Sequence, residues 1–130
     1  MSEIEKIKVG IIDDQKLFAE GLSSLLNSFE IVNEIVTILI PTEKGFRPPF
    51  EHFDILFIDI NMPHKDGFEV SEIIRGRNPK QKIILLSARE DRLSMEKAKG
   101  LNLNGYLFKS MSTDILKEAI ETVLAGDSYY

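Results

Sequence analysis

Four short apolar runs of the chain each end in a polar residue, and segments of helical periodicity separate the runs. Continuous apolar runs of this length are typical of strands that are buried on both faces, as the strands of a parallel sheet are. Strands that alternate with helical segments indicate repeated strand–helix units. The alternation therefore predicts an α/β domain with a mostly parallel sheet. The runs and the residues that end them are 9–12 with Asp13 and Asp14, 55–58 with Asp59, 83–86 with Ser87, and 105–108 with Lys109.

Apolar side chains and helix-capping residues set the expected elements. Ser112 is the expected N-cap of the last helix, and Gly100 and Gly126 are expected to end helices. The expected strands are 7–13, 32–38, 54–59, 82–86 and 105–108, and the expected helices are 16–28, 68–77, 92–99 and 113–124. Apolar residues at helical spacing predict buried helix faces. On the first and last helices these are Leu17, Phe18, Gly21, Leu22, Leu25 and Leu26, and Ile115, Leu116, Ala119, Ile120 and Val123.

Residues 39–53 do not follow this alternation. Pro41, Gly45, Pro48 and Pro49 interrupt any helical pattern where a second helix would connect the second and third strands. A proline lacks the backbone donor of a helix and keeps the residue before it out of the helical conformation. We therefore expect the second helix to be short or irregular.

The composition limits the chain to one domain. Its 130 residues suffice for one hydrophobic core and are too few for two ordinary domains. The net charge of -5 argues against nucleic acid or an anionic membrane as a direct partner, and the lack of cysteine excludes disulfides and cysteine-based zinc sites. No signal peptide is evident, and no apolar stretch approaches the ~18 residues of a membrane helix. We expect a cytoplasmic protein with no membrane contact.

The polar residues at the strand ends have the chemistry of a phosphoryl-transfer site. In an open parallel sheet, ligands bind outside the carboxyl ends of the strands. Neighbouring carboxylates repel one another unless a hard divalent cation such as Mg²⁺ lies among them. A cation and an ammonium group together neutralise the charge of a phosphoryl group, and a hydroxyl can donate to its oxygens. The residues expected at this edge are Asp13, Asp14, Asp59, Ser87 and Lys109.

These residues resemble the receiver domain of two-component response regulators. The matching segments follow the family's order and nearly its spacing, and the resemblance covers residues 6–126. It implies a flavodoxin-like, doubly wound α/β fold with a five-stranded parallel sheet of order 2-1-3-4-5. The matching segments are Asp13-Asp14, residues 59–67, Ser87-Ala88 and residues 105–109.

The resemblance implies a phosphoacceptor and a metal site. Asp59 is the expected phosphoacceptor, which takes a phosphoryl group from a sensor histidine kinase. Asp14, Asp59 and the backbone carbonyl of Asn61 are the expected ligands of Mg²⁺, which Mn²⁺ can replace. Asp13 is expected to act through metal-bound water. The protein would be a signalling domain that assists its own phosphorylation and dephosphorylation, and not an enzyme with a separate substrate.

The resemblance also implies a conformational switch. Ser87 and Lys109 are expected to follow the phosphoryl group, and the inward or outward position of Tyr106 to report the state of Ser87. Residues 105–110 and 120–130 further resemble receivers that precede a helix-turn-helix output domain. We therefore expect transcriptional control, a homodimer promoted by phosphorylation, and DNA binding only through an output domain. Residues 1–130 are expected to form a single receiver domain without that output domain.

Simpler interpretations of the same residues remain open at this point. Asp13 and Asp14 can serve as a helix cap and its neighbour, and Ser87 can cap the helix at 92–99. Lys109 can be a solvated surface residue. His64 follows the phosphoacceptor motif, but a lone loop histidine is assigned no role.

Two other classes of protein share part of the pattern. A phosphohydrolase of the haloacid dehalogenase type needs a second carboxylate two residues after the first, where this chain has Asn61. A flavodoxin-like FMN-binding protein needs a phosphate-cradling loop at residues 13–16, where this chain has two acidic residues.

Many receivers have a proline after the lysine that corresponds to Lys109, whereas this chain has Ser110. A cis bond before a residue other than proline costs ~3 kcal/mol, so the state of this bond is left open.

Overall fold

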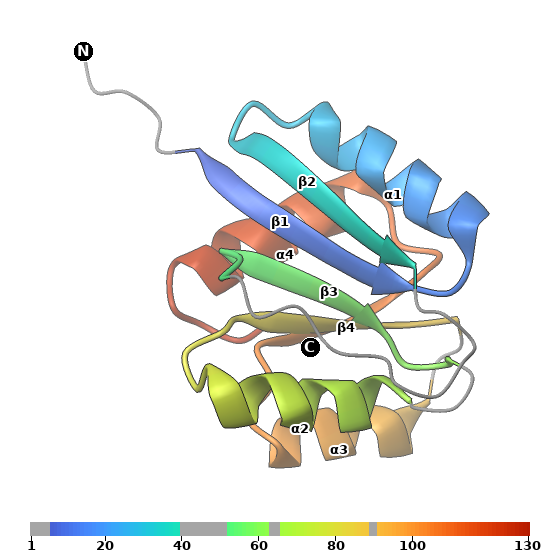
Figure 1. Ribbon diagram of the computed structural model, residues 1–130, viewed down its shortest axis with the longest axis vertical. Coiled ribbons are helices and arrows are strands. Elements are labelled where there is room, and N and C mark those ends of the chain that lie inside the picture. The colour runs from blue at the N-terminus through green and yellow to red at the C-terminus, as the bar shows by residue number, and fades with distance from the viewer. Residues whose placement is uncertain (1–5, 40–51, 63–65, 89–90) are drawn as a thin grey trace.

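The computed structural model describes residues 6–39, 52–62, 66–88 and 91–130. Within these residues, five strands form one sheet in the order β2-β1-β3-β4-β5, and every neighbouring pair is parallel (Figure 1). The predicted fold class and strand order are therefore confirmed. The elements are β1 (Ile7–Asp13), α1 (Lys16–Asn27), β2 (Val32–Leu39), β3 (Ile55–Asp59), α2 (Gly67–Arg77), β4 (Ile83–Ser87), α3 (Arg92–Gly100), β5 (Gly105–Phe108) and α4 (Thr113–Leu124).

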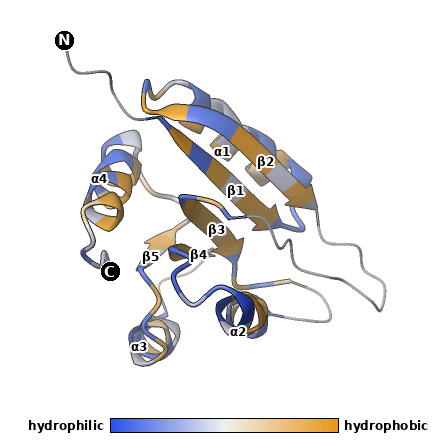
Figure 2. Cartoon of the chain, turned by 60° about the vertical axis from the view of Figure 1, so that its left-hand side comes forward, coloured by the Kyte–Doolittle hydropathy of each residue, from blue (hydrophilic) through white to orange (hydrophobic). Residues whose placement is uncertain are grey.

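Helices cover both faces of the sheet and bury two apolar layers. Successive side chains of a strand point to opposite faces, so Ile11 belongs to the layer under α1 and α4, whereas Ile12 belongs to the layer under α2 and α3. Figure 2 shows the apolar central strands enclosed between these helices. Burial on both faces explains why β1, β3 and β4 are continuous apolar runs in the sequence.

Most element boundaries agree with those expected from the sequence. The side chain of Ser112 accepts a hydrogen bond from the N–H of Ile115, which confirms the predicted N-cap of α4. Gly126 follows α4 with φ +98°, as expected of a glycine that ends a helix. The prediction for Gly100 was wrong, because α3 includes this residue and its C-cap is Leu101; the left-handed backbone conformation follows at Asn102, with φ 56°. Asparagine tolerates this left-handed conformation better than most residues.

The predicted buried faces of α1 and α4 were too wide. In α1 the buried residues are Ala19, Leu22 and Leu26, while Leu17 is 83% exposed and Gly21 also faces solvent. In α4, Ile115 is 40% exposed. The sheet contacts a narrower stripe of each helix than the spacing of apolar residues alone indicates.

The crossover between β2 and β3 is described only at its ends. The expected short or irregular second helix would lie at residues 40–51, outside the described residues, and His64 also lies outside them. At the far end, Phe53 is fully buried, and both of its backbone groups bond to the side chain of Gln81, at 3.1 Å and 2.7 Å. This contact fixes the entry into β3, which leads to Asp59.

Gly67 allows α2 to begin directly against the end of β3. A Cβ atom at this position would lie 2.5 Å from the backbone oxygen of Asp59 and 2.9 Å from the Cα of Ile60. The N–H of Gly67 donates to the carbonyl of Ile60 at 2.9 Å, and Asp66 caps the helix by accepting from the N–H of Glu69. Any side chain at residue 67 would therefore push α2 away from the backbone that carries Asp59.

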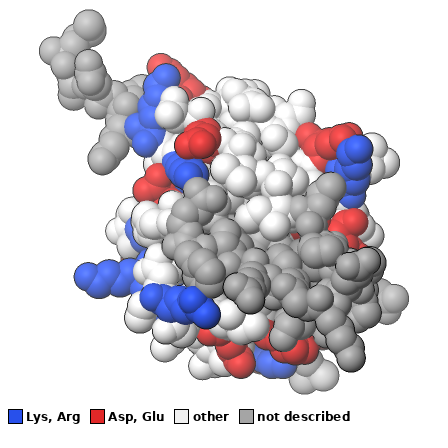
Figure 3. All heavy atoms as spheres, viewed as in Figure 1, with Lys and Arg blue, Asp and Glu red and all other residues white. Residues whose placement is uncertain are grey.

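The surface carries charges of both signs. On the face shown in Figure 3, acidic and basic side chains are interspersed among the coloured atoms. None of the helices in the described ranges is long and apolar enough to cross a membrane.

Candidate functional site

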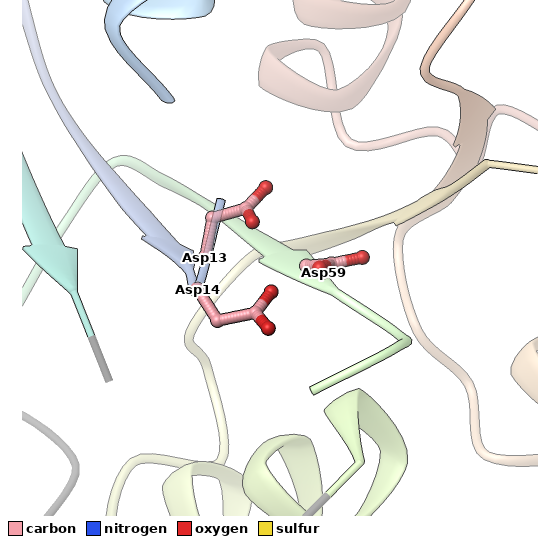
Figure 4. A group of neighbouring side chains, drawn as sticks. All are labelled: Asp13, Asp14 and Asp59. Atoms are coloured by element: carbon pink, nitrogen blue, oxygen red, sulfur yellow. The ribbon is translucent and has the colours of Figure 1, made fainter. Parts of the chain in front are cut away.

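Three aspartates meet at the carboxyl edge of the sheet. Asp13 ends β1 and Asp59 ends β3, and the pairing of Ile12 with Ile58 places the two ends side by side. Asp14 follows directly, and one oxygen from each of the three carboxylates lies within 4.8 Å of the others (Figure 4). Asp13 is fully buried and Asp59 is 1% exposed. The sequence-predicted acidic cluster is therefore present in the fold.

The cluster leaves one oxygen of each aspartate without a hydrogen bond. Asp13 Oδ1 accepts from the N–H of Gln15 at 2.8 Å, and Asp59 Oδ1 accepts from the N–H of Asn61 at 3.2 Å. Among the described residues, Asp13 Oδ2, Asp14 Oδ1 and Asp59 Oδ2 are buried and accept no hydrogen bond. Buried carboxylate oxygens need a positive partner. One oxygen from each of the three carboxylates lies within 4.8 Å of the others, and such a group of oxygens can hold a hard cation such as Mg²⁺.

Lys109 supplies a positive charge to this cluster from the end of β5. Its Nζ lies 3.2 Å from Asp13 Oδ2 and 3.3 Å from Asp59 Oδ2, close enough for two ion pairs. The side chain of Lys109 is only 10% exposed. Lys109 is therefore not a solvated surface lysine, and its ammonium faces the carboxylate that is the candidate phosphoacceptor.

The carboxyl group of Asp59 has a raised pKa. Burial is the largest cause, because it disfavours the charged form, and the like charge of Asp13 adds to it; together they raise the pKa of Asp59 to about 7. The ammonium of Lys109 and the N–H of Asn61 lower the pKa of Asp59 but do not outweigh burial. A buried carboxyl group with such a pKa next to a charged partner is typical of a functional site.

Ser87 lies at the end of β4, next to the end of β5. It is 4% exposed, and its carbonyl accepts from the N–H of Lys109 at 2.7 Å. With Asn61, Asp91 and Ser94 it lines a cavity of about 320 Å³. The N-cap of α3 is Asp91, which accepts from the N–H groups of residues 93 and 94, so Ser87 does not cap this helix. Ser87 therefore lies beside the cavity, at the edge of the sheet that carries Asp59.

Tyr106 points into the protein. It is 3% exposed and belongs to the apolar layer under α2 and α3, and its ring packs edge to face against Phe108 with centroids 5.8 Å apart. Its hydroxyl has no hydrogen-bond partner among the described residues. Tyr106 therefore occupies the inward position of the two that the resemblance implies.

Three remaining expectations concern Asn61, the helix-capping interpretation and the Lys109-Ser110 bond. Asn61 is exposed two residues after Asp59. The N-cap of α1 is Gln15, whose side chain makes no capping bond, so neither Asp13 nor Asp14 is the N-cap residue of this helix. No cis peptide bond occurs in the described parts of the chain, so the bond between Lys109 and Ser110 is trans.

The sequence analysis missed two residues of the site. Gln15 Oε1 accepts a hydrogen bond from Lys109 Nζ at 2.7 Å, and the ammonium lies 4.4 Å from the ring centroid of Phe18. Their positions in the sequence could have indicated this, because Gln15 directly follows the acidic pair and Phe18 lies about one helical turn after Gln15. Phe18 was assigned only to the buried face of the helix.

The parallel sheet, with three carboxylates and one lysine at its carboxyl edge, defines an α/β domain with a candidate metal site at the ends of its strands. The sequence pattern of the response regulator receiver domain matches residues 9–121. The chain therefore belongs to the response regulator receiver domain family.

Individual relatives agree with this assignment. The transcriptional regulatory protein LnrK of Bacillus subtilis (strain 168) is 34% identical over 120 residues, which cover 92% of this chain and 54% of LnrK. A probable chemotaxis protein CheY of Rhizobium etli is 35% identical over 130 residues, which cover 97% of this chain and 98% of that protein. The response regulator RcsB, solved in a complex with DNA, shares the fold with a TM-score of 0.79 at 20% identity, over 97% of this chain and 64% of the RcsB chain.

The chain is shorter than several of the proteins that it matches. It spans 61%, 52% and 54% of the length of three transcriptional regulators to which it is 30%, 33% and 34% identical. The shared part is the receiver domain, so the match concerns this domain and not the remainder of those regulators.

Proposed function

We propose that Asp59 accepts a phosphoryl group from the phosphohistidine of a sensor histidine kinase. The observation that carries this proposal is the ammonium of Lys109, which lies 3.3 Å from the buried carboxylate of Asp59 inside an acidic cluster. A structural carboxylate in this position would need only one ion pair, whereas here several acidic oxygens converge on the same point. Membership of the receiver family supports the same assignment.

In the proposed reaction, an oxygen of Asp59 attacks the phosphorus in line with the leaving histidine nitrogen. The phosphorus–nitrogen bond breaks, the new oxygen–phosphorus bond forms, and the electron pair leaves with the imidazole. Lys109 donates toward the phosphoryl oxygens and neutralises part of their charge. The raised pKa of Asp59 means that a positive partner is needed to keep this carboxylate charged and nucleophilic.

Asp14, Asp59 and the backbone carbonyl of Asn61 would hold Mg²⁺ or Mn²⁺, and Asp13 would contribute to the metal site through water. When bound, the cation supplies charge neutralisation for the phosphoryl group. The three unbonded carboxylate oxygens of the cluster support this assignment. Asn61 and Ser87 line the cavity that the phosphoryl group would enter.

The proposed output is a change in conformation and not the release of a product. Ser87 and Lys109 would both bond to the phosphoryl group and draw the end of β4 toward Asp59, and Tyr106 would respond beside them. The domain would assist its own phosphorylation and dephosphorylation. Such a switch needs an inactive and an active conformation of similar free energy. Phosphorylation can shift the equilibrium between them only by the difference in its interaction free energy with the two conformations.

The proposed partners are a histidine kinase, a second copy of the phosphorylated domain and an output domain. Relatives of this chain are named transcriptional regulators, and RcsB was solved with DNA. With a net charge of -5, the receiver itself would not be the DNA-binding part. We propose transcriptional control through an output domain, in the cytoplasm.

Intact mass spectrometry after incubation with acetyl phosphate and Mg²⁺ tests the phosphoacceptor. One added phosphoryl group that hydroxylamine removes is the expected result, and Asp59→Asn should gain none. Asp14→Asn is the matched control, because it also removes one charge from the cluster but leaves the nucleophile, so it should be phosphorylated slowly. Modification of Asp59→Asn at the wild-type rate would contradict the proposal, and steady hydrolysis of a phosphomonoester would indicate a phosphohydrolase instead.

A further inference from the structure

The ammonium of Lys109 has more neighbours than the two carboxylates that its proposed role requires. Its Nζ lies 3.2 Å from Asp13 Oδ2, 3.3 Å from Asp59 Oδ2 and 2.7 Å from Gln15 Oε1, and 4.4 Å from the ring centroid of Phe18. An ammonium group has three N–H donors. The contact with Gln15 is the shortest of the three polar contacts, and it alone involves a neutral group.

Gln15 is itself fixed relative to the acidic cluster. Its backbone N–H donates to Asp13 Oδ1 at 2.8 Å, and its carbonyl accepts from the N–H of Ala19 at 3.0 Å as the first bond of α1. The side chain of Gln15 makes no capping bond to the helix. The amide oxygen of Gln15 therefore accepts from Lys109 and not from the helix. The two backbone hydrogen bonds of Gln15 fix the position from which its side chain reaches Lys109.

We infer that Gln15, with the ring of Phe18, is a positioning residue that holds the ammonium of Lys109 where the phosphoryl group arrives. This inference rests on the proposed function, in which Lys109 contacts that group. Asp13 and Asp59 hold Lys109 only while their charge is available to it. A cation in the cluster, or esterification of Asp59, reduces that charge, but neither changes the amide oxygen of Gln15.

Phe18 adds an attraction that also does not depend on the carboxylates. A lysine ammonium over the face of an aromatic ring is attracted by the ring quadrupole, more strongly where water is excluded. The side chain of Lys109 is only 10% exposed, and Phe18 packs against the apolar layer under α1 and α4. The ring of Phe18 therefore contacts the ammonium from one side, and the hydrogen bond to Gln15 orients the ammonium.

Two substitutions at residue 15 separate the hydrogen bond from the shape of the side chain. Gln15→Met keeps the length of the side chain and removes the acceptor, whereas Gln15→Glu keeps an acceptor oxygen at the same reach. Leu17→Ala is the matched control, because Leu17 lies on the first turn of α1 and is 83% exposed. Phe18→Leu removes the aromatic face and keeps an apolar side chain.

The first measurement is the NMR signal of the Lys109 ammonium in the unphosphorylated, magnesium-free protein. We expect a slowly exchanging signal in the wild type and in Gln15→Glu, and a broadened or shifted one in Gln15→Met. The second measurement is the rate at which acetyl phosphate adds phosphoryl mass. A hydrogen bond to a charged group, weakened here because Gln15 is exposed, corresponds to a rate about five- to tenfold lower in Gln15→Met. Phe18→Leu should be slower by a smaller factor, and Leu17→Ala should match the wild type.

The two measurements distinguish failure of the inference from failure of the proposed function. A wild-type ammonium signal and a wild-type rate in Gln15→Met would overturn the inference, even if Asp59 is phosphorylated normally. A wild-type protein that gains no phosphoryl group would overturn the proposed function. In that case the ammonium signal, which requires no phosphoryl donor, still decides whether Gln15 holds Lys109.

Discussion

The ammonium of Lys109 lies 3.3 Å from the carboxylate of Asp59, yet the pKa of Asp59 is raised to about 7. Burial and the neighbouring Asp13 outweigh the lysine, so the charged form of Asp59 is less stable in the folded protein than in the unfolded chain. Ionisation of Asp59 in the absence of a bound metal cation therefore lowers the free energy of unfolding.

The first prediction is a decrease in stability as the pH rises, measured without metal. The folded pKa of Asp59 lies above its unfolded value of 3.8, so its favourable contribution is fully present below that value. It is lost as the pH rises through about 7, because the folded protein then releases a proton that it bound more tightly than the unfolded chain. Urea denaturation in EDTA at pH 5 and pH 8 should show this loss. Asp59→Asn should remove much of the difference and be more stable than the wild type at pH 8.

The second prediction concerns Mg²⁺. A cation among the carboxylates should relieve their repulsion and stabilise the protein by about 2.7 kcal/mol at one hundred times its dissociation constant. A thermal melt with increasing Mg²⁺ measures this effect, and Asp14→Ala should lose most of it. Sodium chloride at equal ionic strength is the control. A midpoint that responds equally to both salts would mean that the cluster binds no specific cation.

The strand ends were predictable from the sequence, because each apolar run is followed directly by a charged or polar residue. A buried strand ends where such a residue reaches the edge of the sheet. β1 and β5 begin and end where the sequence analysis placed them, and Asp13, Asp59 and Lys109 meet as a parallel sheet requires. The contact between Lys109 and Gln15 joins residues 94 positions apart. No periodicity in the sequence reports such a contact, because it depends on how α1 leaves β1 and on the rotamer of one lysine.

The third prediction compares two leucines of α1, one of which the sequence analysis wrongly assigned to the buried face. Helical spacing assigned both Leu17 and Leu22 to the core, but Leu17 is 83% exposed and Leu22 is 3% exposed. Leu22→Ala should lower the free energy of unfolding by about 2–5 kcal/mol because it leaves a cavity. Leu17→Ser should change it by less than about 0.5 kcal/mol. Chemical denaturation of both variants checks the pair, and equal costs would show that α1 is rotated relative to the sheet.

The fourth prediction concerns the buried hydroxyl of Tyr106. This group has no hydrogen-bond partner among the described residues, although the side chain is 3% exposed. Tyr106→Phe removes an unsatisfied polar group and keeps the ring contact with Phe108, so it should raise the free energy of unfolding by about 1 kcal/mol. Tyr106→Ala should instead be strongly destabilising. A loss of more than about 1 kcal/mol in Tyr106→Phe would show that the hydroxyl is bonded in solution.

The last prediction follows the signal from the site to the edge of the sheet. The N–H of Tyr106 donates to the carbonyl of Tyr129, and the N–H of Tyr129 donates to the carbonyl of Asn104, both at 2.9 Å. The segment after α4 therefore pairs with β5 beside Tyr106, and movement of β5 must strain these bonds.

Hydrogen exchange with and without beryllofluoride, a mimic of the phosphoryl group, measures this coupling. We expect the largest changes in residues 87–99, because α3 has fewer buried residues than α4, and at Tyr106 and Tyr129, which are joined by a backbone hydrogen bond. Ser87→Ala and Lys109→Ala should weaken the response at Tyr129 more than near Asp59, since both residues link the site to β5. Changes confined to Asp13, Asp59 and their neighbours would mean that the domain binds the mimic without switching.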